Sequence, residues 1–190
     1  MGRKLQIMSK DPPTFGINTS LDMLRKLHWE LDQLANTEDH DDQTAAYHCF
    51  NAAVTAWHLY EWVWLDIKRD HKLRARLARE AGVPPQKFKK HHWKKLVQER
   101  MPFYEILRYC KIIATASKHA GVELTDEDPT DLDVYASARS TLPDSPGSSP
   151  MKISRWKIRL GDKVFPAEFV LESAGMIWRE IIDEFGIAGD

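Results

Sequence analysis

The chain has 190 residues and a mass of 22.0 kDa, the size of one ordinary domain with a hydrophobic core of its own. Hydrophobic residues make up 43% of the chain, which favours a packed globule over a disordered chain. No apolar run reaches the roughly 18 residues that cross a bilayer, and residues 1–13 lack the apolar segment of a signal peptide. We therefore expect a single cytoplasmic domain, residues 1–190, that makes no membrane contact.

Charge is distributed unevenly, although the formal net charge is only −1. Residues 68–100 hold twelve Lys and Arg against three acids, whereas residues 123–144 hold seven acids against Arg139 alone. Such a basic segment predicts an arm that binds nucleic acid or an acidic protein, and a solvated helix balanced by the acidic loop is the alternative. The predicted binding residues of this arm are Lys87, Lys89, Lys90, His91, His92, Lys94 and Lys95.

The first helix is expected to begin after the N-cap Thr19, with Asp22 completing a capping box, and to end near Asn36. Residues 43–69 follow as a helix that is apolar on almost every side, which predicts the buried centre of the fold. This helix either continues to Gly82 or breaks near Asp70. A basic helix over 86–100 and a second buried helix over 103–119 are expected next.

The last third of the chain changes character. A strand is expected near 132–140, and then a hairpin that turns at Gly161 and Asp162. Pro166 marks its second strand, which we expect to include Phe169 and Leu171, as a sheet edge. A final helix is expected over 173–185. The predicted fold is mainly α (α+β), with a bundle of four to five helices (19–121), an acidic Pro/Ser-rich loop (122–150), and a C-terminal hairpin with a capping helix (151–190).

Each of the two buried helices carries one polar stripe with spacings of three, four and three residues. Buried polar groups need partners, so we expect the two stripes to face each other across a cleft that holds an anion or phosphate. A purely structural hydrogen-bonded network is the alternative. The stripes comprise His48, Asn51, Thr55, His58 and Glu61 on the first helix, and Arg108, Lys111, Thr115, Lys118 and the adjoining His119 on the second.

The candidate catalytic residues are drawn from both stripes: His58, Glu61, Arg108, Lys118 and His119. His48, Asn51 and Lys111 are further candidate binding residues. No cofactor is expected, and the alternative is a divalent metal held by His58, Glu61 and His119. The two cysteines, Cys49 and Cys110, lie among apolar neighbours and are expected to be reduced core residues, with a disulfide between their helices as the alternative.

Residues 50–63 and 107–119, followed by a terminal hairpin and a Trp-containing helix, resemble a family of uncharacterised bacterial and phage-borne proteins. More remotely, two long helices that end in a basic and histidine motif resemble the HEPN superfamily of helical ribonucleases and nucleotide-binding domains. The HEPN signature places four to six residues between Arg and His. Here ten residues separate Arg108 from His119 and seven separate Lys111 from His119, so the chain departs from that pattern.

Two functions are therefore expected. The favoured one is a non-enzymatic binding or accessory protein, related to phage or defence, whose basic arm contacts nucleic acid or an acidic partner. The alternative is a HEPN-like nucleic-acid or nucleotide-processing enzyme. In that enzyme His119 would act as general acid and base with His58 as its partner, and Arg108 and Lys118 would stabilise phosphate charge.

Overall fold

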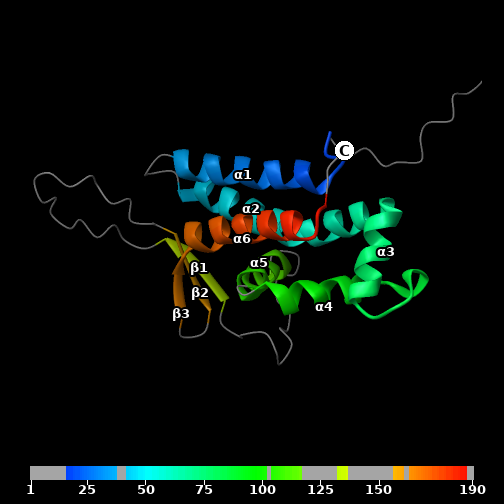
Figure 1. Cartoon of the computed structure of the whole chain (residues 1–190). Helices are drawn as coiled ribbons and strands as arrows, with labels where there is room; N and C mark the ends of the chain where they lie inside the picture. The colour runs from blue at the N-terminus through cyan, green and yellow to red at the C-terminus, as the bar shows by residue number, and fades with distance from the viewer. Residues whose placement is uncertain are drawn as a thin grey trace, which may run out of the picture.

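The protein is mainly helical with a small antiparallel sheet, as expected (Figure 1). The structure is a computed structural model that describes residues 16–37, 42–101, 104–116, 132–136, 156–160 and 163–187. Within them the elements are α1 (Ser20–Asn36), α2 (Asp42–Arg69), α3 (His71–Glu80), the 3₁₀ turn η1 (Pro85–Lys87), α4 (Lys90–Arg100), α5 (Tyr104–Ala116), β1 (Leu132–Ala136), β2 (Trp156–Leu160), β3 (Lys163–Pro166) and α6 (Ala167–Glu184).

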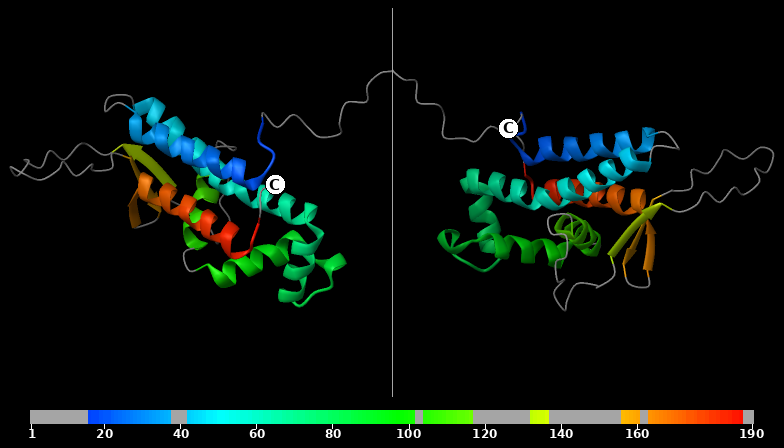
Figure 2. Two further views of the ribbon diagram at one scale, coloured as in Figure 1. Left: turned by 45° about the horizontal axis from the view of Figure 1, so that its top comes forward. Right: turned by 180° about the vertical axis from the view of Figure 1, so that it is seen from behind.

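The helix α2 is the centre of the fold, because α1, α5 and α6 all pack against it. In Figures 1 and 2 the sheet lies at one end of this bundle, and α3 leads away from the other end to α4. None of the described helices combines the length and the apolar character that a membrane span requires.

The start of α1 is capped as expected. The Thr19 hydroxyl accepts from the Asp22 backbone N–H at 3.1 Å, and the Asp22 carboxylate accepts from the Thr19 N–H at 3.1 Å. The Asp22 pKa lies below its usual value, chiefly because the carboxylate accepts the Asn18 backbone N–H. From α2, the buried Asp66 carboxylate accepts the Ser20 N–H at 2.7 Å and so ties this helix end to the centre.

The break between α2 and α3 falls at Asp70, one of the two positions expected. Its carboxylate accepts from the backbone N–H groups of Lys72 and Leu73 at 2.8 and 3.0 Å and so caps a new helix. The end of α3 is followed by Gly82, whose φ of +68° is the left-handed conformation that glycine adopts without strain.

The basic helix begins at Lys90, not at residue 86, so that prediction is wrong by one turn. Phe88 and Lys89 are extended, and the Phe88 side chain is buried against Trp64 with ring centroids 5.7 Å apart. The Lys89 N–H donates to His92 Nδ1 at 3.1 Å, so an imidazole takes the position of the usual acidic partner.

The sheet has the order β1-β2-β3, with both pairs antiparallel. Val134 lies opposite Ile158, and Ile158 lies opposite Phe165. The two-residue hairpin and the edge position of β3 are confirmed, whereas residues 137–140 of the expected first strand lie outside the described residues.

The final helix begins at Ala167 and not at residue 173, so the assignment of Phe169 and Leu171 to a strand is wrong. Pro166 is the N-cap residue, and the positions buried after it are spaced as on one helix face. These positions are Ala167, Val170, Leu171, Ala174, Gly175, Ile177, Trp178, Ile181 and Ile182.

Cys49 and Cys110 are both buried and unpaired, as expected. Removal from water raises the pKa of each thiol to about 12, so both remain protonated at neutral pH.

Candidate functional site

Two members of the α2 polar stripe, His48 and Thr55, pair with residues of α1. His48 Nδ1 lies 2.9 Å from Glu30 Oε2, and Thr55 Oγ1 accepts from Lys26 Nζ at 2.7 Å. Lys26 Nζ also donates to Glu30 Oε1 at 3.1 Å. These four residues form the α1–α2 polar cluster. Only 4% of Glu30 is exposed, so its carboxylate relies on these two partners for the hydrogen bonds that water would otherwise supply.

The other residues of the α2 stripe have different environments. Asn51 is exposed, and His58 is partly buried. Glu61, which was expected in the buried cleft, has 58% of its side chain exposed and pairs with Lys90 of α4. The members of the stripe therefore have different neighbours, since His48 and Thr55 contact α1 and Glu61 pairs with Lys90 of α4.

The α5 stripe is described only in part. Arg108, Lys111 and Thr115 are partly buried on α5, whereas Lys118 and His119 lie outside the described residues. The five-residue catalytic set and the metal set of His58, Glu61 and His119 therefore remain predictions. Among the residues that the structure does describe, no group of three or more His, Cys, Asp or Glu side chains is placed to hold a metal ion.

The predicted basic arm consists of α3, η1 and α4, and most of its basic side chains face solvent. Several are paired with acids: Lys90 with Glu61, Lys95 with Glu99 at 3.6 Å, and Arg100 with Glu80 at 2.8 Å. Within the described ranges, Lys87, Lys89 and Lys94 form no ion pair. These three lysines, together with the exposed His91 between them in sequence, are called the α4 basic surface below.

The two histidines of α4 belong to the same end of the helix. His91 Nε2 and His92 Nε2 are 3.1 Å apart, and the His92 ring stacks on Phe88 with centroids 6.0 Å apart. Loss of solvent contact lowers the His92 pKa, and the positive charges of His91, Lys89 and Lys95 lower it further. Neutral His92 accepts the Lys89 N–H at Nδ1 and therefore carries its proton on Nε2, directed at His91.

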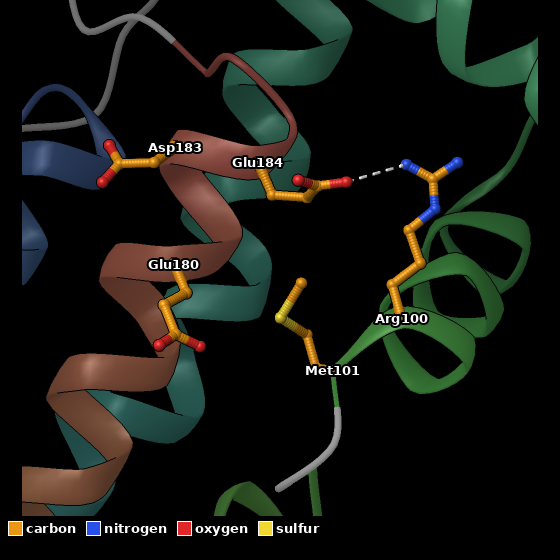
Figure 3. A pocket seen from close by; sticks show the side chains of 5 residues that line it. All are labelled: Arg100, Met101, Glu180, Asp183 and Glu184. Atoms are coloured by element: carbon orange, nitrogen blue, oxygen red, sulfur yellow. Dashed lines mark hydrogen bonds and ion pairs between the residues drawn. The ribbon is translucent and has the colours of Figure 1, made fainter.

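A hollow of about 580 Å³ lies where α4 ends beside α6 (Figure 3). Arg100 and Met101 line it together with Glu180, Asp183 and Glu184 of α6, and in Figure 3 Glu184 points toward Arg100 whereas Asp183 points away from it. Arg100 donates to Glu184 at 3.5 Å and lies over the Phe185 ring, 5.1 Å from its centroid. Because acids outnumber bases on its wall, this hollow repels anions and does not extend the α4 basic surface.

Sequence reasoning identified the basic arm but missed Lys26 and Glu30. The available signal was their spacing of four residues on the first helix, which is typical of an ion pair. Comparison of the chain with protein-family models, curated protein sequences and solved structures gives no match.

Proposed function

We propose that the protein binds polyanions, and in particular nucleic acid, through the α4 basic surface. The observation that carries this proposal is that Lys87, Lys89 and Lys94 are exposed and form no ion pair in the part of the chain that is described, although the net charge of the whole chain is −1. Their ammonium groups remain available for phosphate. The positive end of the α4 dipole lies at the same place and adds to the attraction.

This surface supports phosphate contact and not base reading. Lysine ammonium groups are hydrated point charges that contact phosphate without a fixed orientation, and none of the three is held by a described ion pair. We therefore infer binding with little dependence on sequence and a strong dependence on salt. Three phosphate contacts would give a slope of about −2.7 in log affinity against log salt concentration on double-stranded DNA.

The Lys87/Lys89/Lys94→Glu variant should bind a labelled DNA duplex at least about tenfold more weakly than the native chain, and its salt dependence should flatten. Fluorescence anisotropy over a salt series measures both quantities. The matched control is Lys68/Lys72/Arg79→Glu, which makes the same charge change at exposed positions of α2 and α3. Equal affinity of native chain and α4 variant contradicts the proposal, and equal losses in both variants would show a response to net charge alone.

The affinity for DNA should also rise as the pH falls from 7.5 to 5.5, because His92 gains positive charge beside Lys89. The lowered pKa of His92 moves this rise to the acidic end of the range. A histidine whose pKa is lower in the folded than in the unfolded chain stabilises the fold at pH values above its unfolded pKa. This contribution to the free energy of unfolding is lost as the pH falls. A His92→Gln variant should show a flatter pH profile in the same anisotropy measurement, and an unchanged profile would contradict the assignment to His92.

A further inference from the structure

Four aromatic rings follow one another from the interior of the protein to the α4 basic surface. Trp64 of α2 is partly buried and contacts the buried Phe88, with ring centroids 5.7 Å apart. Phe88 stacks on His92 with an angle of 18° between the ring planes, and His92 contacts the exposed His91 at a centroid distance of 3.9 Å. These four residues are called the ring column. Its outermost ring, that of His91, is therefore supported by rings that are anchored in the core.

Hydrogen bonds as well as ring contacts hold the outer end of the column. His92 Nδ1 accepts the Lys89 backbone N–H at 3.1 Å, so neutral His92 carries its proton on Nε2. His92 donates this proton to His91 Nε2, which lies 3.1 Å from it. A ring that is already held in place loses less conformational entropy when a ligand stacks on it than a freely rotating side chain loses. His91 is thus exposed and preorganised at the same time.

The surroundings of His91 leave one ring face open and add positive charge beside it. His92 lies on one side of the ring, and within the described residues no second ring contacts His91. Lys94 follows His91 by three residues and so lies on the same side of α4, while Lys89 adjoins the column through its N–H bond to His92. In Figures 1 and 2, the turn between α3 and α4 lies at the end of the molecule opposite the sheet.

We propose that His91 stacks on an unpaired nucleobase while the lysines of the α4 basic surface contact the adjoining phosphates, so that the ligand is single-stranded nucleic acid. This inference rests on the proposed binding of nucleic acid and names its substrate class. A strand with unpaired bases alternates phosphate groups with flat rings, which matches ammonium groups placed beside an open ring face. An acidic protein supplies negative charge without that regular aromatic partner.

The same arrangement explains why pairing of the bases should matter. Inside a duplex both faces of each internal base are covered by its neighbours, so the lysines can reach phosphates but the His91 ring cannot stack. Stacking accepts any of the bases, because each has a flat aromatic face. The proposed contact therefore agrees with a surface that has little sequence preference.

Fluorescence anisotropy with two labelled strands of equal length tests the stacking contact on the full chain. One is an oligodeoxythymidylate of about 12 nucleotides, and the other is an abasic strand that keeps the phosphates and lacks the bases. At pH 7.5 His92 is neutral, because loss of solvent contact lowers its pKa. The thymidylate strand should bind at least about fivefold more tightly than the abasic strand, the difference expected from one stacked base. Equal affinities for the two strands overturn the inference.

Substitution of His91 locates the contact. His91→Ala should lose about fivefold or more in affinity for the thymidylate strand and little for the abasic strand or a duplex, whereas His91→Phe keeps a ring and should keep the preference. His71→Ala is the matched control, because His71 is an exposed histidine at the start of α3, and this variant should bind like the native chain.

Two results with His91→Ala contradict stacking. The first is unchanged affinity for the thymidylate strand, and the second is an equal loss on the thymidylate and abasic strands, since the ring would then act through charge or through the fold. Failure of the proposed function is a different result, namely equal duplex affinity of the native chain and the Lys87/Lys89/Lys94→Glu variant. A native chain that binds the duplex through these lysines and does not distinguish thymidylate from abasic strands contradicts only the inference about His91.

Discussion

The Trp178→Ala variant should lose about 3–5 kcal/mol of unfolding free energy, the largest stability change expected of a single substitution in this chain. The Trp178 side chain is completely buried at the junction of α6 with the central helix. Its indole N–H donates to the Ala56 carbonyl at 2.7 Å, and its ring meets the Tyr60 ring edge-on with centroids 4.7 Å apart. Truncation therefore creates a large cavity and removes a buried hydrogen bond between α6 and α2.

Chemical denaturation followed by far-UV circular dichroism measures this loss. Trp178→Phe separates its two causes, because the ring is retained while the hydrogen bond is lost, and it should cost less than half as much. The matched control is Trp29→Ala on α1, where the indole is 54% exposed and the loss should stay within about 1 kcal/mol. Equal losses at the two tryptophans would contradict the place given to Trp178 in the core.

The elements that sequence predicted well are those whose signals are local. The capping box at Thr19, the cap at Asp70 and the two-residue hairpin turn each depend on residues within four positions of one another. The start of α6 was misjudged for a local reason as well. The apolar residues between Phe165 and Leu171 fit the two-residue period of a strand as well as the period of a helix. Pro166 is compatible both with the end of a strand and with the start of a helix.

The pairing of His48 and Thr55 with α1 could not be predicted from the sequence, because it depends on which helices are neighbours in space. The spacing of His48 and Thr55 showed that they share one face of α2, but several other helices carry polar side chains that could contact that face. Contact with Lys26 and Glu30 follows from the antiparallel packing of α1 on α2, which periodicity alone does not determine. The basic arm was easier to predict, since charge density is a local property of the sequence.

The Glu30→Leu variant should be about 2 kcal/mol less stable than the native chain. Its carboxylate is the acceptor that satisfies both Lys26 Nζ and His48 Nδ1 in the α1–α2 polar cluster. Removing it leaves two polar groups facing each other between packed helices, and loss of one member of a buried charged network commonly costs 3–5 kcal/mol. The expected cost is smaller here because 35% of the Lys26 side chain is exposed and its ammonium group can turn toward water.

A second substitution distinguishes lost charge pairing from lost packing. The Lys26→Met/Glu30→Leu double variant removes both charges and keeps the apolar volume, so it should recover most of the stability lost by Glu30→Leu alone. The comparison is a double-variant cycle of unfolding free energies, with Lys26→Met as the remaining corner. Additive losses at the two positions would show that Lys26 and Glu30 act independently. A positive coupling energy of about 1 kcal/mol or more would show that the cluster is a cooperative tie between α1 and α2, which is the role that its burial indicates.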